Sequence, residues 1–277
     1  MRNVPTIALN NGVTMPQLGF GVWQVPDDEV AAAISTALEA GYRSFDTAAA
    51  YGNEEGTGRA LAASGLPREE LFVTTKLRSS EQGYDAALRA LDASLDRLGL
   101  DQLDLYLVHW PPEADAYEET WRAFEKIYAD GRARAIGVSN FQPTHLNRLI
   151  DLGGTVPAVN QIELHPWLQQ SVPRAFQSDH GIVTEAWSPL GQGGGLLKEP
   201  KLAELAERHG RTVAQIVLRW SLQLGNVVIP KSVTPARIRE NIGVFDFELS
   251  AEDMAAIGAL NTDTRLGANP DSVNWVS

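Results

Sequence analysis

The chain has 277 residues, 44% of them hydrophobic, and is therefore long enough to bury a large core. A formal net charge of -12 argues against broad contact with nucleic-acid phosphates or an anionic membrane, and the lack of cysteine excludes disulfides and thiolate chemistry. No stretch approaches the roughly 20 apolar residues of a membrane span, and the N-terminus lacks the apolar core of a signal peptide. We therefore expect a cytoplasmic protein that holds any anionic ligand in a local basic cluster.

The first predicted element is a β-hairpin. In segment 6–15 (TIALNNGVTM), Asn-Asn-Gly stands between two short apolar runs, a pattern that indicates a tight turn. From Gln17 to about Asn241, short apolar runs then alternate with longer amphipathic ones. Strands are predicted at 17–23, 43–48, 71–77, 103–110, 133–140, 157–164, 181–190 and 227–232. Helices fill the spaces; segment 85–99, for example, has leucines at helical spacing and a closing glycine.

This alternation predicts a parallel sheet, because parallel neighbours need a crossover that a helix supplies. About eight strands without a linker or composition shift favour a closed (β/α)8 (TIM) barrel, with residues 1–277 as one domain and the hairpin closing the barrel floor. The rival is an open, doubly wound dinucleotide-binding sheet. That fold expects Gly-x-Gly-x-x-Gly after its first strand, and here Gly19 and Gly21 have no third partner.

Four polar residues stand at or just after predicted strand ends, where such a barrel concentrates its chemistry: Asp46, Tyr51, Lys76 and His109. Each alone has an ordinary structural explanation, but lysine and aspartate in an apolar barrel mouth are costly unless they pair. Together they suit proton transfer. Asp46 would keep Lys76 charged, and Lys76 would lower the pKa of Tyr51 from about 10 toward neutrality. Tyr51 could then protonate a developing alkoxide, to which neutral His109 donates a hydrogen bond.

A second cluster surrounds the predicted start of a helix near the C-terminus. Lys231 ends the last strand, and Ser232, Thr234 and Arg237 follow it. Thr234 could cap the helix and Pro235 could begin it. Helix amides and two bases together form an anion site on an otherwise acidic protein. A capped helix with solvated bases is the alternative interpretation.

Asp46, Lys76 and His109 lie within DTA, TTKL and LVHWP, and Tyr51 follows DTA by three positions. These residues, with the surrounding motifs, resemble the catalytic tetrad of the aldo-keto reductases. The resemblance continues in order through IGVSNF, PAVNQIELHP, WSPLGQG and PKSVTPARIREN, over nearly the whole chain. It implies NADPH-dependent reduction of carbonyl compounds on a (β/α)8 barrel. The short chain is most similar to bacterial 2,5-diketo-D-gluconate reductases, which implies small aldehydes, ketones, diketo-gluconate or methylglyoxal-like compounds as substrates.

The same resemblance implies where the dinucleotide binds. Its nicotinamide would meet polar side chains at strand ends and an aromatic platform, namely Ser139, Asn140, Gln161 and Trp187. Its pyrophosphate would lie along the glycine-rich turn that contains Ser188, Leu190, Gly191 and Gln192. Its 2′-phosphate and adenine would contact the cluster at the last helix, namely Lys231, Ser232, Val233, Thr234, Arg237, Glu240 and Asn241. A site for that phosphate favours NADPH over NADH.

The substrate pocket is expected beside the strand ends. Its predicted lining is Trp23, Ala49 and Trp110, with Ala50 leaving room near Tyr51 and Trp275 as a further candidate from the tail. Position 78 departs from the family pattern, because many relatives carry tryptophan there and this chain has arginine. Arg78 could attract a carboxylate-bearing keto acid; a solvated loop arginine is the alternative.

Two other function classes stay open from the residues alone. A lysine at a barrel strand end can form a Schiff base, so Lys76 could belong to a lyase. A regulatory protein that keeps the barrel and the nucleotide without turnover is the other. The five histidines show no metal-ligand spacing, so we expect no metal. We expect a monomer that acts on a small carbonyl substrate.

Overall fold

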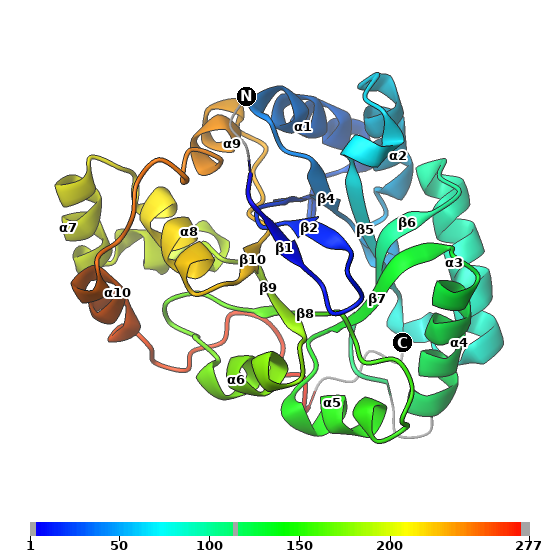
Figure 1. Ribbon diagram of the computed structural model, residues 1–277. Coiled ribbons are helices and arrows are strands. Elements are labelled where there is room, and N and C mark those ends of the chain that lie inside the picture. Colours follow the sequence, from blue (N-terminus) through cyan, green and yellow to red (C-terminus); the bar gives the residue numbers. More distant parts are fainter. Residues whose placement is uncertain (1–3, 113–115, 273–277) are drawn as a thin grey trace.

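The strands of the main sheet follow one another in chain order, each parallel to its neighbours (Figure 1). The computed structural model describes residues 4–112 and 116–272. The strands of this sheet are β3 (Phe20–Gly21), β4 (Ser44–Asp46), β5 (Phe72–Leu77), β6 (Leu103–Val108), β7 (Ala133–Ser139), β8 (Val159–Glu163), β9 (Val183–Trp187) and β10 (Val227–Val228). Its two edges meet, because Leu18 bridges to Val228 and the Gly19 amide donates to the Val228 carbonyl oxygen at 2.9 Å. The predicted closed barrel is confirmed.

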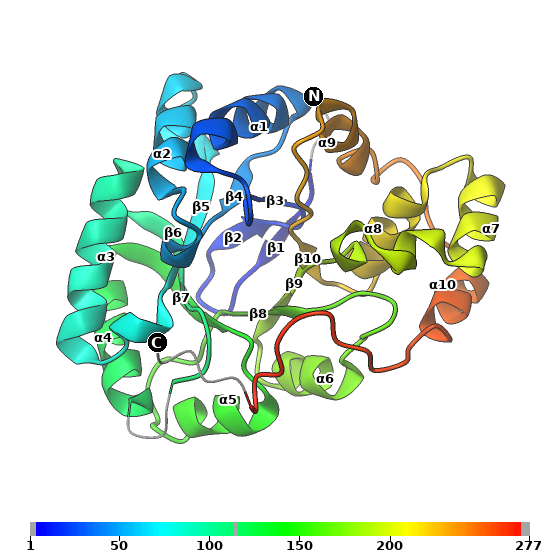
Figure 2. The same cartoon turned by 180° about the vertical axis from the view of Figure 1, so that it is seen from behind.

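Helices lie outside this sheet and surround it, as Figures 1 and 2 show from opposite sides. They are α1 (Asp27–Ala40), α2 (Glu54–Ala63), α3 (Tyr84–Leu98), α4 (Tyr117–Ala129), α5 (Pro143–Ile150), α6 (Ser171–Asp179), α7 (Pro200–His209), α8 (Val213–Gln223), α9 (Pro235–Asn241) and α10 (Ala251–Gly258). Within the described ranges, none of them has both the length and the apolar character needed to cross a membrane.

Helix α3 illustrates why these segments fold as predicted. Its buried residues include Ala87, Leu91, Leu95 and Leu98, which recur every three or four positions, the period of one helical face. Gly99 then ends the helix with a φ of 64°, a left-handed conformation that glycine adopts without steric cost. Packing of this apolar face against the sheet, rather than helix propensity alone, stabilises the helix.

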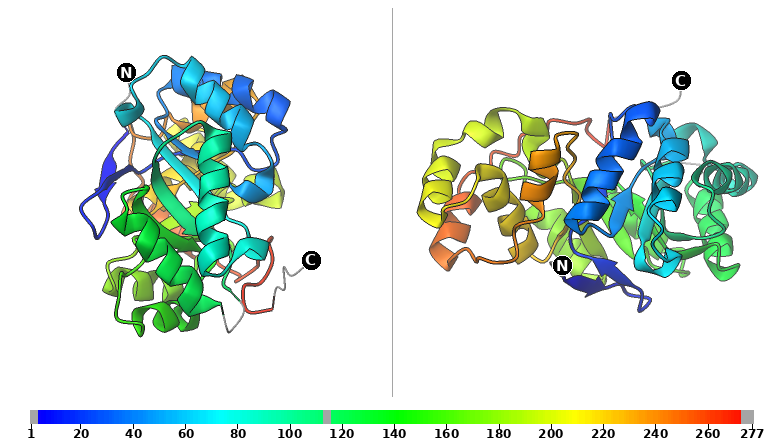
Figure 3. Two further views of the ribbon diagram at one scale, coloured as in Figure 1. Left: turned by 90° about the vertical axis from the view of Figure 1, so that its right-hand side faces the viewer. Right: turned by 90° about the horizontal axis from the view of Figure 1, so that it is seen from above.

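The antiparallel hairpin of β1 (Thr6–Ala8) and β2 (Thr14–Pro16) lies across one end of the barrel (Figure 3). Met15 of β2 is fully buried in a cluster with residues of the barrel strands, among them Phe72 and Val159, which begin β5 and β8. The side-chain amide of Asn11 donates to the carbonyl oxygen of Arg134, near the start of β7, at 2.9 Å. The hairpin therefore covers the amino ends of the strands and closes the floor, as predicted.

The carboxyl ends of the strands carry buried charge instead. Asp46, Lys76, Glu163 and Glu185 are each at most 3% exposed. Charged groups are costly to bury unless they are paired or hydrogen-bonded, so their partners define the chemistry of this end of the barrel.

Candidate active site

A cavity of about 990 Å³ opens at the carboxyl ends of the strands. It extends from the loop after β3 to helix α9, and Gly267 of the C-terminal segment forms part of its wall. Every predicted site residue in the described part of the chain lines it except Lys76, Ala49 and Gly191, which are buried. Trp275 lies outside the described residues. The structure therefore brings residues from most of the chain together at one site.

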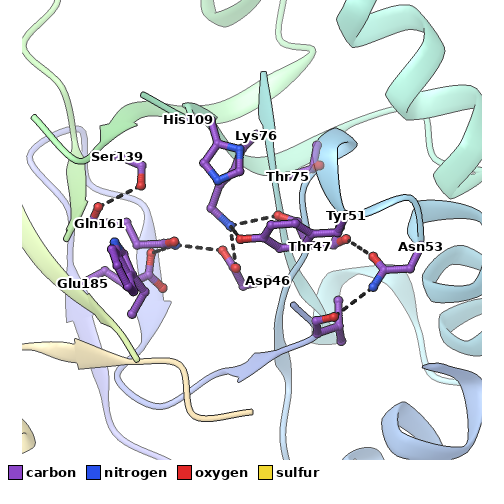
Figure 4. Close-up of polar contacts among 12 residues, drawn as sticks. Asp46, Thr47, Tyr51, Asn53, Thr75, Lys76, His109, Ser139, Gln161 and Glu185 are labelled. Carbon is purple, nitrogen blue, oxygen red and sulfur yellow. Dashed lines mark hydrogen bonds and ion pairs between the residues drawn. The ribbon is translucent and has the colours of Figure 1, made fainter. Parts of the chain in front are cut away.

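At one end of this cavity, four side chains converge on one point (Figure 4). Lys76 Nζ lies 2.6 Å from Asp46 Oδ1 and 3.4 Å from the Tyr51 hydroxyl, and it donates to the Thr47 carbonyl oxygen at 3.0 Å. The ring of His109 meets that of Tyr51 edge-on, with 5.6 Å between centroids. Lys76 belongs to β5, between β4, which Asp46 ends, and β6, which His109 follows, so the parallel register places them side by side.

Lys76 is fully buried and still holds its proton. Burial alone lowers the pKa of a lysine, but the carboxylate of Asp46 more than offsets this, and the pKa of Lys76 is raised above its ordinary value. The ion pair expected from the cost of burying both charges is present. Lys76 is therefore a fixed ammonium beside the Tyr51 hydroxyl.

The prediction that the pKa of Tyr51 is lowered is wrong. Burial is the largest influence and raises the pKa of Tyr51, the Lys76 ammonium lowers it, and the net result stays above the ordinary value. In the enclosed mouth, the loss of solvation of the phenolate outweighs its attraction to Lys76. Tyr51 is thus a neutral phenol at physiological pH, the form that can give away a proton.

His109 is neutral, as expected. Burial, and then the positive charges of Lys76 and Arg78, lower the pKa of His109 to about 3. Its ring can therefore donate one hydrogen bond without carrying charge.

A buried carboxyl group that the sequence analysis did not assign extends this network. The side-chain nitrogen of Gln161 donates to Asp46 Oδ2 and to Glu185 Oε2, both at 2.8 Å. Burial, and then the nearby charge of Asp46, raise the pKa of Glu185 to about 8, so this group is protonated at neutral pH. Glu185 stands opposite Gln161 in the pairing of β8 with β9. A lone carboxylate within the apolar run GIVTEAW was the signal that could have found it.

The indole of Trp187 is fixed by its neighbours. Trp187 Nε1 donates to Asn140 Oδ1 at 2.8 Å, while Asn140 Nδ2 donates to the His109 carbonyl oxygen at 3.0 Å.

Asn140 and Ser188 have φ values of 64° and 48°, in the left-handed region that residues other than glycine seldom occupy. Such strained backbone persists only where the surroundings hold it, and it is concentrated at functional sites.

The C-terminal segment is attached to the end of β8 by one carboxylate. Glu163 accepts hydrogen bonds from the backbone amides of Leu266 at 2.6 Å and Gly267 at 3.1 Å. Burial by itself raises the pKa of Glu163, but hydrogen bonds from His165 and from these two amides lower it overall. Glu163 therefore carries the negative charge that anchors the segment beside the cavity. Glu163 lies within the motif PAVNQIELHP, and this anchoring role was not predicted from the sequence.

The far end of the cavity is basic. Lys231 and Arg237 both line it, and neither makes an ion pair or a side-chain hydrogen bond within the described ranges. Helix α9 begins at Pro235 as predicted, but Thr234 makes no side-chain cap. Instead, the Ser232 hydroxyl accepts from the Thr234 amide at 3.1 Å, which shapes the turn before the helix.

Three comparisons with known proteins agree with this geometry. A model of the aldo/keto reductase family matches residues 15–262. An aldo-keto reductase of Mycobacterium sp. (strain JLS) is 58% identical over 272 residues, 98% of each chain. The methylglyoxal reductase DkgA of Salmonella typhimurium is 52% identical over 273 residues, again 98% of each chain. A solved Gox0644 mutant in complex with NADPH has a TM-score of 0.94 and 48% identity, covering 99% of this chain and 100% of that one.

Proposed function

Because the chain belongs to the aldo/keto reductase family, we propose that it reduces small aldehydes and ketones to alcohols with NADPH as hydride donor. One observation carries this proposal: inside the cavity, the Tyr51 hydroxyl lies 3.4 Å from a fully buried ammonium, that of Lys76. The methylglyoxal reductase among the relatives supports small dicarbonyl compounds as one substrate class.

In the proposed reaction, NADPH supplies the hydride that adds to the carbonyl carbon. The carbonyl oxygen then becomes an alkoxide, and Tyr51 gives it the proton that completes the alcohol. The phenolate left on Tyr51 is stabilised by the Lys76 ammonium, which Asp46 holds in place at 2.6 Å. Neutral His109 donates a hydrogen bond to the same oxygen and helps to orient the substrate. Tyr51 and His109 thus face the cavity and contact the substrate, and Lys76 and Asp46 act through Tyr51.

The nicotinamide end of the cavity fits this cofactor. Gln161 uses its side-chain nitrogen to bind Asp46 and Glu185, which leaves its side-chain oxygen to accept from a carboxamide. Ser139 donates its own proton to the Gln161 carbonyl oxygen and also keeps an acceptor site. Trp187, held at its Nε1 by Asn140, offers an apolar face for a planar ring. We propose that the main role of Asn140 is to position that indole.

The basic end fits the phosphate groups. Two positive side chains that lack acidic partners in the described part of the chain, Lys231 and Arg237, line the cavity of a protein whose net charge is -12. Such charges suit a terminal phosphate, which takes several charge-assisted hydrogen bonds at once. Glu240 and Asn241 line the same end, where we place the adenine.

The geometry weighs against a Schiff-base lyase. That chemistry needs a neutral, accessible amine, whereas Lys76 is fully buried and its pKa is raised by Asp46. A nucleotide-binding protein without turnover is disfavoured because the proposed proton donor and its supporting charges are already assembled.

Loss of NADPH absorbance with a panel of methylglyoxal, nitrobenzaldehyde and diketo-gluconate tests the proposal. We expect turnover with the wild type and at least about a 100-fold loss of kcat in Tyr51→Phe, with NADPH binding retained. Full activity in Tyr51→Phe would remove the proton-donor role, and absence of NADPH binding would remove the whole proposal.

A further inference from the structure

Arg78 is an exposed guanidinium at the catalytic end of the cavity. It directly follows β5, the strand that carries Lys76. One of its terminal nitrogens donates to the carbonyl oxygen of Ala49, in the 3-10 turn Ala49–Tyr51 that presents the proposed proton donor. The side chain is therefore tied to the rim of the reaction site and does not extend freely into solvent.

The charge on Arg78 has no acidic partner among the residues that the structure describes. The carboxylate of Asp46, at the same end of the cavity, already pairs with Lys76. The positive charge of Arg78 also helps to lower the pKa of His109, so its electrostatic field reaches the ring that we propose binds the substrate oxygen. Lys231 and Arg237 belong to the opposite, basic end of the cavity, where we place the phosphate of the cofactor.

We propose that Arg78 binds the carboxylate of substrates in which an acid group lies a few bonds from the reactive carbonyl, such as aldehyde acids and oxo acids. This inference rests on the proposed carbonyl reduction. A guanidinium has five N–H donors in a planar fork, and the bond to Ala49 uses one, so a pair of parallel donors remains for a carboxylate. The bond to Ala49 also holds the fork near its binding orientation before substrate arrives.

The contact would act mainly on substrate binding. The carboxylate is remote from the reacting atoms, so Arg78 stabilises the bound substrate and the transition state about equally. Its removal should therefore raise KM for acid substrates and leave kcat nearly unchanged.

Matched pairs of aldehydes test this directly: succinic semialdehyde against butanal, and 4-carboxybenzaldehyde against benzaldehyde. In Arg78→Gln, we expect kcat/KM to fall about 10- to 100-fold more for the acid member than for the neutral member, and mostly through KM. Arg78→Lys keeps the charge without the fork and should lie between the two. Added salt should reduce the acid preference of the wild type and not that of Arg78→Gln.

Arg122 provides a matched control, because it is an exposed arginine paired with Glu118 on α4 and does not line the cavity. Arg122→Gln should leave the acid-to-neutral ratio unchanged. An unchanged ratio in Arg78→Gln, or an equal loss for both members of a pair, would overturn the inference while leaving carbonyl reduction in place.

A binding measurement separates this inference from the proposed function. Calorimetric titration of the NADPH-saturated protein with benzoate and with benzamide needs no turnover. We expect Arg78→Gln to weaken benzoate binding about tenfold or more and to leave benzamide binding unchanged. Equal affinity for the two compounds in the wild type would sink the carboxylate site even if neutral aldehydes are reduced well.

Discussion

Gly267 lies against the indole of Trp187 so closely that a Cβ at this position would stand 2.4 Å from a ring carbon. The same Cβ would lie 3.2 Å from Glu163 Oε2, the oxygen that accepts the Gly267 amide proton. The C-terminal segment is therefore packed without spare room between its anchor and the proposed nicotinamide platform.

The variant Gly267→Ala should displace this indole and weaken NADPH binding. Overpacking at a filled contact costs about 1–3 kcal/mol, which corresponds to roughly a tenfold or greater rise in Kd. Fluorescence titration with NADPH measures it. Gly258→Ala is the control, since a Cβ there has nothing within 4 Å. Equal NADPH affinity in the two variants would show that Gly267 does not position Trp187.

Removal of the Lys76 charge should cost both stability and activity. In Lys76→Met, the carboxylate of Asp46 is left buried without its ion-pair partner, which costs about 3–5 kcal/mol of unfolding free energy. The double variant Lys76→Met with Asp46→Asn should recover most of that stability, because no charge is then stranded. Denaturant unfolding measures both variants.

Activity separates the two roles of Lys76. We expect kcat to stay at least about 100-fold below wild type in the stable double variant, because the phenolate of Tyr51 has lost its stabilising charge. Recovery of activity along with stability would mean that Lys76 serves only the fold.

The barrel could be predicted because its signals are local. The strands show as apolar runs, and most helices show as a face with a period of three or four residues and a glycine soon after their end. Boundaries were less predictable. The last strand was expected at 227–232 but is observed as Val227–Val228, because Pro230 has no amide proton to donate. The Pro230 carbonyl oxygen instead accepts from the Gly21 amide at 3.2 Å and helps to close the barrel.

The ion pair of Asp46 with Lys76 was predictable, since two buried charges on neighbouring strands must meet or be costly. The contacts of Glu185 were not. Glu185 reaches Asp46 through Gln161, and that path depends on the register of β8 with β9 and on side chains that cross the barrel interior. The predicted lowering of the Tyr51 pKa was wrong for a related reason, because the desolvation of the phenol depends on all the residues that enclose the barrel mouth.

Arg237 should decide between the two dinucleotides. Without a partner in the described ranges, its charge is available to the additional phosphate of NADPH, so Arg237→Gln should raise the Kd for NADPH about tenfold and leave that for NADH nearly unchanged. Arg239→Gln is the control, because Arg239 lies on the same helix and already pairs with Glu39 at 3.1 Å. An equal loss for both dinucleotides would place Arg237 away from that phosphate.

Glu185 predicts a pH dependence of stability. Its pKa rises from 4.5 to about 8 on folding, so the folded protein keeps a proton that the unfolded chain releases. The stability from this group is fully present below pH 4.5 and is lost as pH rises toward 8, by at most about 1.4 kcal/mol per pH unit. Glu185→Gln keeps the shape and an acceptor for Gln161 but cannot ionise. In urea unfolding, the free energy of unfolding of Glu185→Gln should therefore rise relative to that of the wild type between pH 4.5 and 8. If the two proteins instead show the same pH dependence of stability, Glu185 is already ionised when folded.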